Sequence, residues 1–263
     1  MMKRLLLACV LGLTFLLTVQ AVGAETIKMG YWIHKPHHYL PDPAGKPRGA
    51  GITYFEMMAA KMGYTVEWEG PLPFLRILDY LKDGTIDGCA HLLKLPVIEG
   101  FVDYGDQPYH NAQAIFVARQ ENPVAQITAI KDVAGYRVGF IVGIDPSLFV
   151  RDNLTQLKLD NVPPGDAMWE QSLTKLLADR IDVVHDMNAY TLPFIAKQMK
   201  IDSQVKTLLL PEPPQPVYVG FSRQSAKGKA LIEKYNAVQK DMPPFGQADY
   251  EKLIQQDSDA VAK

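Results

Sequence analysis

The sequence is poor in cysteine, with only Cys9 and Cys89 among its 263 residues. Cleavage of an N-terminal segment on export would leave Cys89 alone, so that no internal disulfide could form. Charge of one sign is not in large excess either. The net charge is −2 and becomes −4 on loss of Lys3 and Arg4, because residues 1–24 contain no acidic residue. This mild acidity argues against nucleic acid or an anionic membrane as a partner.

Sequence motifs of common enzyme classes are missing as well. The chain contains no nucleophile elbow, no P-loop and no metalloprotease helix. We therefore expect a protein without enzymatic activity and without a cofactor. With 48% hydrophobic and 21% charged residues, the composition is that of an ordinary globular protein with an ample core.

Long apolar runs are absent except near the N-terminus. Lys3 and Arg4 precede an apolar run over residues 5–19, and small residues follow at 22–24. The run is shorter than the roughly 20 residues of a membrane-spanning helix, so residues 1–24 are predicted to be a cleaved signal peptide. Leu-Leu-Ala before Cys9 resembles a lipoprotein site, but the apolar run continues beyond it. A soluble protein of a bacterial periplasm is expected.

One pattern occurs twice in the chain. Residues 78–87 and 173–182 each read as a short amphipathic helix, a turn and Ile-Asp before a small apolar strand. His91 and His185 follow these aspartates within four residues. Two such units suggest two similar lobes, each ending a strand where open α/β sheets bind ligands. We interpret Asp87 and Asp182 themselves as structural residues.

Alternating strand and helix patterns predict an α/β fold with mostly parallel sheets. A further helix is expected after Gly143, with Asp145 as its N-cap and Pro146 at its first position. The proline-rich stretch 211–216 is expected to be a stiff extended connector. Strands are expected at 26–32, 64–68, 86–90, 113–117, 136–142, 181–184 and 218–222, and helices at 51–62, 74–82, 172–178, 189–199, 227–241 and 250–256.

Six short motifs then occur in a familiar order. They are GKPRG at 45–49, MGYTVE at 62–67, LKDGTID at 81–87, VDYGDQPY at 102–109, IKDVAGYRVG at 130–139 and DVVHD at 182–186. In this order the sequence resembles the family 3 extracellular solute-binding proteins, the periplasmic receptors of polar amino acid ABC importers.

The resemblance implies two α/β lobes joined by two hinge crossovers, which close around a ligand. Lobe one would comprise residues 25–109 and 216–263, and lobe two residues 110–215. The implied function is capture of a small polar solute for an inner-membrane ABC permease, by a protein expected to be a monomer.

The chain departs from the family where an α-amino acid carboxylate is usually bound. Leu95 and Ile98 stand at the threonine and arginine positions of the family's Thr-x-x-Arg stretch. Ile144 replaces the threonine of a Gly-Thr pair, and Asp145 stands at the helix start that would otherwise favour an anion. The ligand is therefore expected to be amino-acid-like without the usual carboxylate contact. Arg76 and Lys94 remain possible substitutes, although Arg76 is equally compatible with the surface.

All six histidines fall on loops or strand ends near the cleft on the family template. Imidazole binds transition metals and titrates near neutrality, so both a metal and a polar organic ligand are compatible with them. The spacing of His34, His37 and His38 matches no familiar zinc motif, which favours hydrogen bonding to an organic ligand. No metal site is predicted from the sequence.

Asp186 matches the aspartate that binds the ligand's ammonium group in the family, with capping of the next helix as the alternative. Several aromatic residues, Trp169 among them, are candidates for stacking on a cationic ligand. The predicted ligand-binding set is Trp32, His37, His38, Phe74, Arg76, His91, Lys94, Tyr109, Asp145, His185 and Asp186.

Two other functions remain open. A sensory or partner-docking module would share the fold without transport. A dehydratase-like enzyme would use His185 and Asp186 as an acid–base pair. The identity of the ligand and the importer served do not follow from the sequence.

Overall fold

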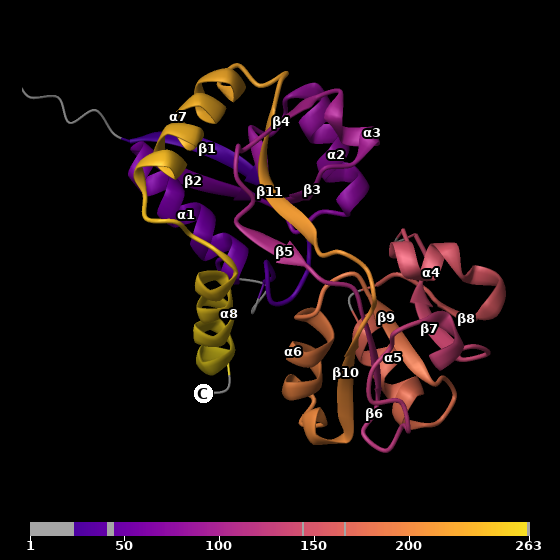
Figure 1. The fold of residues 1–263 in the computed structure, drawn as a ribbon. Helices are drawn as coiled ribbons and strands as arrows, with labels where there is room; N and C mark the ends of the chain where they lie inside the picture. Colours follow the sequence, from indigo (N-terminus) through magenta and orange to yellow (C-terminus); the bar gives the residue numbers. More distant parts are fainter. Residues whose placement is uncertain (1–23, 41–44, 144, 166, 262–263) are drawn as a thin grey trace, which may run out of the picture.

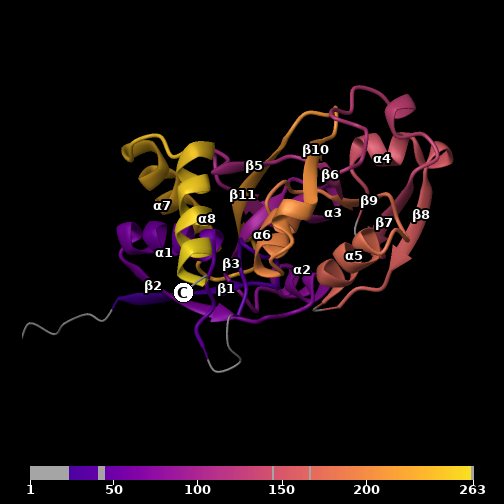
Figure 2. The same cartoon turned by 90° about the horizontal axis from the view of Figure 1, so that it is seen from below.

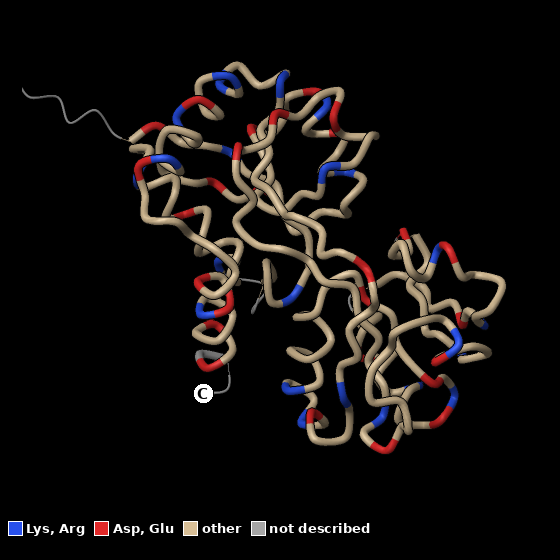
Figure 3. The backbone as a smooth tube through the Cα atoms, viewed as in Figure 1, with Lys and Arg blue, Asp and Glu red and all other residues tan. Residues whose placement is uncertain are grey.

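The computed structural model describes residues 24–40, 45–143, 145–165 and 167–261, arranged around two separate β-sheets (Figure 1). The predicted signal peptide lies almost wholly outside these residues. Within them, no helix is long and apolar enough to cross a bilayer. Lys, Arg, Asp and Glu are spread over both halves of the molecule (Figure 3).

The two sheets have the same internal plan. In the first, the order is β2-β1-β3-β11-β4, with β5 also paired to β11, and in the second it is β10-β6-β9-β7-β8. The strands are β1 (Glu25–Gly30), β2 (Tyr64–Glu69), β3 (Gly88–Leu93), β4 (Val102–Tyr104), β5 (His110–Ala112), β6 (Ile115–Arg119), β7 (Arg137–Ile141), β8 (Lys158–Val162), β9 (Val183–Asp186), β10 (Val205–Leu209) and β11 (Gln215–Ser222).

The sheets are mixed, where mostly parallel sheets were expected. β1 pairs parallel with β2 and β3, and β7 pairs parallel with β8 and β9. β11 and β6 are antiparallel to all of their partners. The difference arises at the crossovers, because β6 and β11 enter each sheet from the other half of the chain, whereas the parallel strands follow helices of their own half.

Helices cover both faces of each sheet, so each sheet has an apolar cluster on either side. One cluster joins α1, α7 and α8 to the first sheet, and another joins α2 and α3 to its opposite face. The helices are α1 (Ala50–Met62), α2 (Phe74–Asp83), α3 (Pro96–Glu99), α4 (Leu148–Asp152), α5 (Met168–Leu177), α6 (Thr191–Gln198), α7 (Gly228–Asp241) and α8 (Gln247–Val261), with 3-10 turns η1 (Ile130–Asp132), η2 (Leu154–Gln156) and η3 (Asp202–Gln204).

The chain passes between the two halves at two neighbouring places. β5 leads into β6, and the proline-rich segment after β10 leads into β11. β5 and β11 lie antiparallel to each other beside the passage, as Figure 1 shows. We keep the names lobe one for the half built on the first sheet and lobe two for the half built on the second. The exact lobe boundaries after Tyr109 and before Pro216 stay a prediction.

The doubled pattern of the sequence corresponds to α2–β3 in lobe one and α5–β9 in lobe two. Asp87 accepts a hydrogen bond from the backbone N–H of Lys28, on β1, at 2.8 Å. Asp182 accepts one from the backbone N–H of Arg137, on β7, at 2.7 Å. The N–H of Asp87 also donates to the Lys28 carbonyl, and the N–H of Asp182 donates to the Arg137 carbonyl. The two aspartates thus join equivalent strands, which agrees with a structural role.

Replacing Asp182 with asparagine is expected to cost about 1–3 kcal/mol of unfolding free energy at pH 7. Its carboxylate also binds the Arg137 guanidinium at 2.7 Å, and this hydrogen bond lowers the pKa of Asp182. Because the folded pKa is lowered, the stabilisation is present above about pH 4 and disappears as the pH falls through the folded value. Urea unfolding measures the loss, with exposed Asp79→Asn on α2 as control. Equal stability of Asp182→Asn and wild type would contradict this role.

The helix expected to begin with Asp145 and Pro146 starts later. α4 begins at Leu148, and the N-cap is Ser147, whose side chain accepts a hydrogen bond from the N–H of Val150. Asp145 is exposed and does not cap the helix. The hydroxyl of Ser147 is fully buried, and a neutral hydroxyl is buried there at much lower cost than a carboxylate. Ile144, of the Gly-Ile pair, lies outside the described residues.

Candidate functional site

The loop after β1 carries three histidines and is attached to the start of α1. That helix has no side-chain cap, and the N–H groups of Ala50 and Gly51 donate instead to the carbonyls of Pro36 and His37, at 2.9 and 2.8 Å. Gly49 has φ 124°, and a Cβ there would lie 2.5 Å from the His37 carbonyl oxygen. A glycine is therefore required for this close approach, which holds His37 at the carboxyl end of β1.

Five histidines meet in this part of lobe one. The ring centroid of His37 lies 4.7 Å from that of His34 and 4.5 Å from that of His91, and the rings of His34 and His91 are 5.2 Å apart. His38 and His110 adjoin them, at 5.3 and 5.0 Å from the ring of His91. We call His34, His37, His38, His91 and His110 the histidine cluster.

Aromatic side chains surround the histidine cluster. The ring of Trp32 lies 4.3 Å from His38 and 4.8 Å from Phe74. Tyr250, on α8, stacks on His110 at 4.0 Å between centroids. Tyr109 is buried against the ring of Tyr54 and reaches the cluster with its hydroxyl. Predicted residues Trp32, Phe74 and Tyr109 thus lie beside predicted His37, His38 and His91.

One nitrogen of each of three clustered rings has a hydrogen-bond partner. Nδ1 of His37 lies 2.6 Å from the Tyr250 hydroxyl, and Nδ1 of His91 lies 3.1 Å from the Tyr109 hydroxyl. Nδ1 of His38 donates to the Trp32 carbonyl at 2.5 Å. The other nitrogens of His37 and His38, Nδ1 of His34 and both nitrogens of His110 are buried without a partner among the described residues.

Burial keeps the histidine cluster uncharged at neutral pH. It lowers the pKa of His34 and His110 to about 3 and that of His38 to about 4. The pKa values of His37 and His91 are also lowered, first by burial and then by neighbouring imidazoles. Neutral imidazole has a free nitrogen lone pair, so the cluster presents acceptors to any cation that reaches it.

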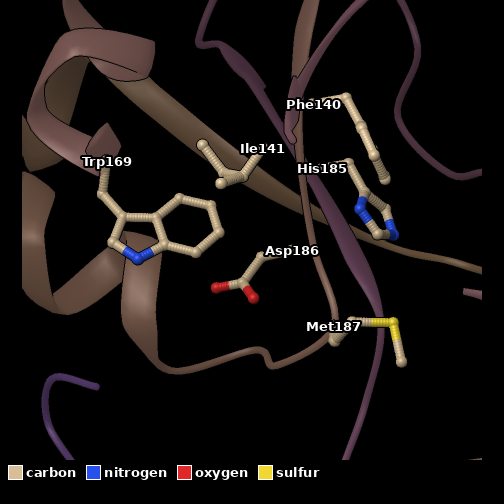
Figure 4. A pocket seen from close by; sticks show the side chains of 6 residues that line it. All are labelled: Phe140, Ile141, Trp169, His185, Asp186 and Met187. Atoms are coloured by element: carbon tan, nitrogen blue, oxygen red, sulfur yellow. The ribbon is translucent and has the colours of Figure 1, made fainter. Parts of the chain in front are cut away.

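Lobe two contributes a buried carboxylate at the end of β9. Asp186 is 4% exposed and lines a cavity of about 10 Å³, which is room for a single water molecule. Figure 4 shows its carboxylate pointing into this cavity beside the Trp169 ring. The cavity is lined by Phe140, Ile141, Trp169, His185, Asp186 and Met187.

The hydrogen bonds of Asp186 argue against a helix-capping role. One oxygen accepts the N–H of Asn188 at 3.2 Å, and Oδ2 has no partner among the described residues. The N-cap of α6 is Tyr190, whose N–H donates to the side chain of Asn188. Burial raises the pKa of Asp186 to about 7. A cation beside Oδ2 would restore its ordinary acidity.

His185 is buried next to Asp186 in the sequence. Its ring stacks on Phe140 at 5.7 Å, and burial lowers its pKa to about 4. No hydrogen bond joins His185 to Asp186 in the described structure, and neighbouring residues of a strand point to opposite faces. The geometry therefore gives little support to an acid–base pair.

The two lobes touch around this region. Lys35 of the histidine loop bonds Glu170 of α5 at 3.3 Å, and Tyr39 packs in the same apolar cluster as Trp169. Tyr190 donates to Glu251 of α8 at 2.7 Å. In Figures 1 and 2, α8 of lobe one lies beside α6 of lobe two. These contacts hold lobe one against Trp169, one of the residues that line the cavity beside Asp186.

Three predicted ligand-binding residues are not brought to this region. Arg76 and Asp145 are exposed, and the Arg76 guanidinium lies 5.9 Å from the ring centroid of Tyr80 on the same helix. Lys94 is also exposed, with its ammonium 4.1 Å from the ring centroid of Tyr218. Their charges remain solvated in this structure, and their role in ligand binding stays a prediction.

The missing arginine itself has a structural explanation. Ile98 is fully buried in the apolar cluster between α2, α3 and the first sheet. Leu95, at the family's threonine position, is the N-cap residue of α3 and makes no side-chain capping bond. The residue at the family's arginine position is therefore part of the core of lobe one.

Sequence reasoning did not single out several residues of the site. Phe140 is the last residue but one of the buried strand β7 and lines the cavity, a position that the strand pattern could have flagged. Tyr250 and Tyr190 had no local signal, because His37 and Tyr250 are 213 positions apart.

Comparison with known proteins identifies the family. The sequence profile of the bacterial extracellular solute-binding proteins, family 3, matches residues 27–249. No curated protein matches the chain significantly. The fold resembles the Bordetella pertussis BvgS periplasmic VFT2 domain, at TM-score 0.68 and 14% identity, over 88% of this chain and 92% of that one.

Two further structures with this fold were solved with amino acids bound. AbpA from Streptococcus pneumoniae, an amino acid ABC transporter substrate-binding protein bound to L-arginine, is 17% identical at TM-score 0.67, with 90% and 96% of the two chains covered. An ancestral arginine-binding protein bound to arginine is 23% identical at TM-score 0.65, with 89% and 98% covered. At these identities the likeness extends to the fold alone.

Proposed function

We propose that this chain, which belongs to the bacterial extracellular solute-binding proteins of family 3, is a receptor that encloses a small amine-bearing solute between its two lobes. The observation that carries the proposal is the buried carboxylate of Asp186, which has one oxygen without a partner and lies in a cavity beside Trp169. A protonated amine would satisfy that oxygen, and the indole face would add a cation–π contact.

The chemistry of the solute follows from which charges surround the site. A carboxylate in the usual family position would meet no cation at residue 98, because Ile98 is apolar and buried in the core, while Arg76 and Lys94 are exposed beside Tyr80 and Tyr218. Leaving a carboxylate unpaired in a closed cleft costs several kcal/mol. A solute that resembles an amino acid but has no α-carboxylate fits the cleft better than the amino acid itself.

Amines are therefore expected to bind at least ~10-fold more tightly than the matching amino acids, since charged hydrogen bonds are worth about 1.5–3 kcal/mol. Agmatine with arginine and cadaverine with lysine are matched pairs that differ only in the α-carboxylate. Titration calorimetry at pH 8 measures both members of each pair. Arginine or glutamine binding in the micromolar range, equal to the amine, would refute this preference.

The solute itself can be identified directly. Mass spectrometry of small molecules released from the purified, unfolded protein is expected to reveal a compound with a basic nitrogen. Asp186→Asn protein purified in parallel is the control and should release none of it. A co-purified dicarboxylate retained by both proteins would contradict the assignment.

We further propose that the protein is exported through residues 1–24 to the periplasm, remains a monomer and delivers its solute to an inner-membrane ABC permease. The family match and the L-arginine-bound transporter protein of similar fold support this role. A sensory role is the second candidate, because the chain also resembles the B. pertussis BvgS periplasmic domain, of which it spans 43%. Solute uptake by cells lacking the gene distinguishes the two, since only a transport receptor is required for uptake.

A further inference from the structure

We propose that His34, His37 and His91 form a binding site for a divalent first-row transition-metal ion. Each of these side chains offers one ligand atom, and the three atoms lie within 4.8 Å of one another. Imidazole nitrogen is a preferred ligand of Zn²⁺, Ni²⁺ and Cu²⁺. The site goes beyond the proposed solute receptor, because the amine-binding residues belong to lobe two and these histidines belong to lobe one.

Hydrogen bonds hold two of the three rings, those of His37 and His91, in a way that suits a metal. The hydroxyls of Tyr250 and Tyr109 engage Nδ1 of His37 and of His91, which leaves Nε2 of each ring for an ion. Metal-binding histidines nearly always have their second nitrogen held in this way. Nε2 of His37 is buried and has no partner among the described residues. The two tyrosines thus supply the outer support that a metal site requires.

Coordination requires only a small contraction. Zinc–nitrogen bonds of 2.0–2.1 Å in a tetrahedral site place the nitrogens about 3.3 Å apart. His34 is only partly buried and lies on a loop, so its ring can turn toward the other two. Three neutral imidazoles leave a fourth position for water or for a donor atom of the solute.

The location agrees with a ligand site. His34 and His37 follow the carboxyl end of β1, and His91 lies on the neighbouring strand β3. Open α/β sheets bind ligands at this edge. The ring of Tyr190, in lobe two, lies 6.1 Å from the ring of His37, so lobe two approaches the three histidines at His37.

The test is zinc binding by the untagged, full-length exported protein after treatment with chelator. Calorimetry at pH 7.5 should give one Zn²⁺ per chain, and the melting temperature should rise with zinc and fall again with EDTA. His34→Gln and His91→Gln should each weaken zinc binding at least ~100-fold, and Tyr250→Phe about 10- to 100-fold. Co²⁺ in the same site should show the visible absorption of a tetrahedral nitrogen-ligated ion.

His185→Gln, which removes a histidine of lobe two, is the matched control and should leave zinc stoichiometry and affinity unchanged. Asp186→Asn should also still bind zinc, so that failure of the metal site and failure of the amine pocket are separate results. His34→Gln alters a partly buried loop residue, and its melting temperature without metal shows whether it is folded. The proposal is overturned if the wild-type protein binds less than one tenth of an equivalent of zinc, or if folded His34→Gln and His91→Gln bind it as wild type does.

Discussion

Replacing Asp186 with asparagine is expected to abolish solute binding and to make the ligand-free protein more stable above pH 7. The carboxylate is 4% exposed, and its burial raises its pKa to about 7. Loss of a buried charge-assisted contact to an ammonium group should weaken binding by at least ~100-fold. The same substitution removes a charge whose burial opposes folding.

The pH dependence of the stability difference follows from the raised pKa. Because the folded pKa exceeds the unfolded value, ionisation of Asp186 opposes folding. The opposition is absent below about pH 4, grows between about pH 4 and 7 and is complete above pH 7. The rise of the Asp186 pKa from 3.8 to about 7 corresponds to about 4 kcal/mol at most. The amide's own burial reduces the expected gain to about 1–3 kcal/mol.

Urea unfolding of wild type and Asp186→Asn between pH 4 and 8, without solute, measures this gain. Exposed Asp106→Asn is the control and should leave the curve unchanged. Solute affinity of the wild type should fall about tenfold per unit below pH 7, as the carboxylate takes up a proton. An Asp186→Asn protein that binds solute as tightly as wild type would remove Asp186 from the site.

Placing the family's arginine back at position 98 is expected to unfold the protein or to cost at least ~3–5 kcal/mol. Ile98 is fully buried among apolar residues of α2 and β3. An arginine there would lose the packing of the isoleucine and leave an unpaired charge in the core. Thermal and urea unfolding of Ile98→Arg measures the cost.

The adjacent residue provides a matched control on the same short helix. Val97 is 68% exposed, so Val97→Arg should change stability by no more than ~0.5 kcal/mol. Ile98→Leu conserves volume and should cost less than ~1.5 kcal/mol. A stable Ile98→Arg protein that binds arginine would show that this position still opens onto the cleft, contrary to its burial in the structure.

Most elements of the fold could be predicted because local patterns specify them. The apolar spacing of residues 51–62 predicts a helix, and α1 spans Ala50–Met62 with Gly63 ending it in a left-handed conformation. Strand starts were less accurate. The strand expected at 86–90 is β3, which spans Gly88–Leu93. It starts later than expected because Asp87 binds the backbone of Lys28 on β1 just before the strand begins. The start of α4 was misplaced because Asp145 and Ser147 are both good caps, and only burial distinguishes them.

The candidate site was likewise only partly predictable from the sequence. The motif order predicted the family and a strand that ends near Asp186, but the local pattern did not show that Arg76 and Lys94 are exposed. Spacing along the chain argued against a metal for His34, His37 and His38. His91 is distant from them in the sequence but reaches the same place from another strand.

The sequence by itself determined the two α/β lobes and the absence of the carboxylate-binding arginine, because periodicity and residue identity are local properties. The tertiary structure alone decided which polar groups are buried together. Tyr250 meets His37 across 213 positions, and Asp186 is buried beside Trp169 and Phe140, which come from other elements of lobe two. The raised pKa of Asp186 and the unpartnered nitrogens of the histidines arise from this burial, since desolvation depends on neighbours in space.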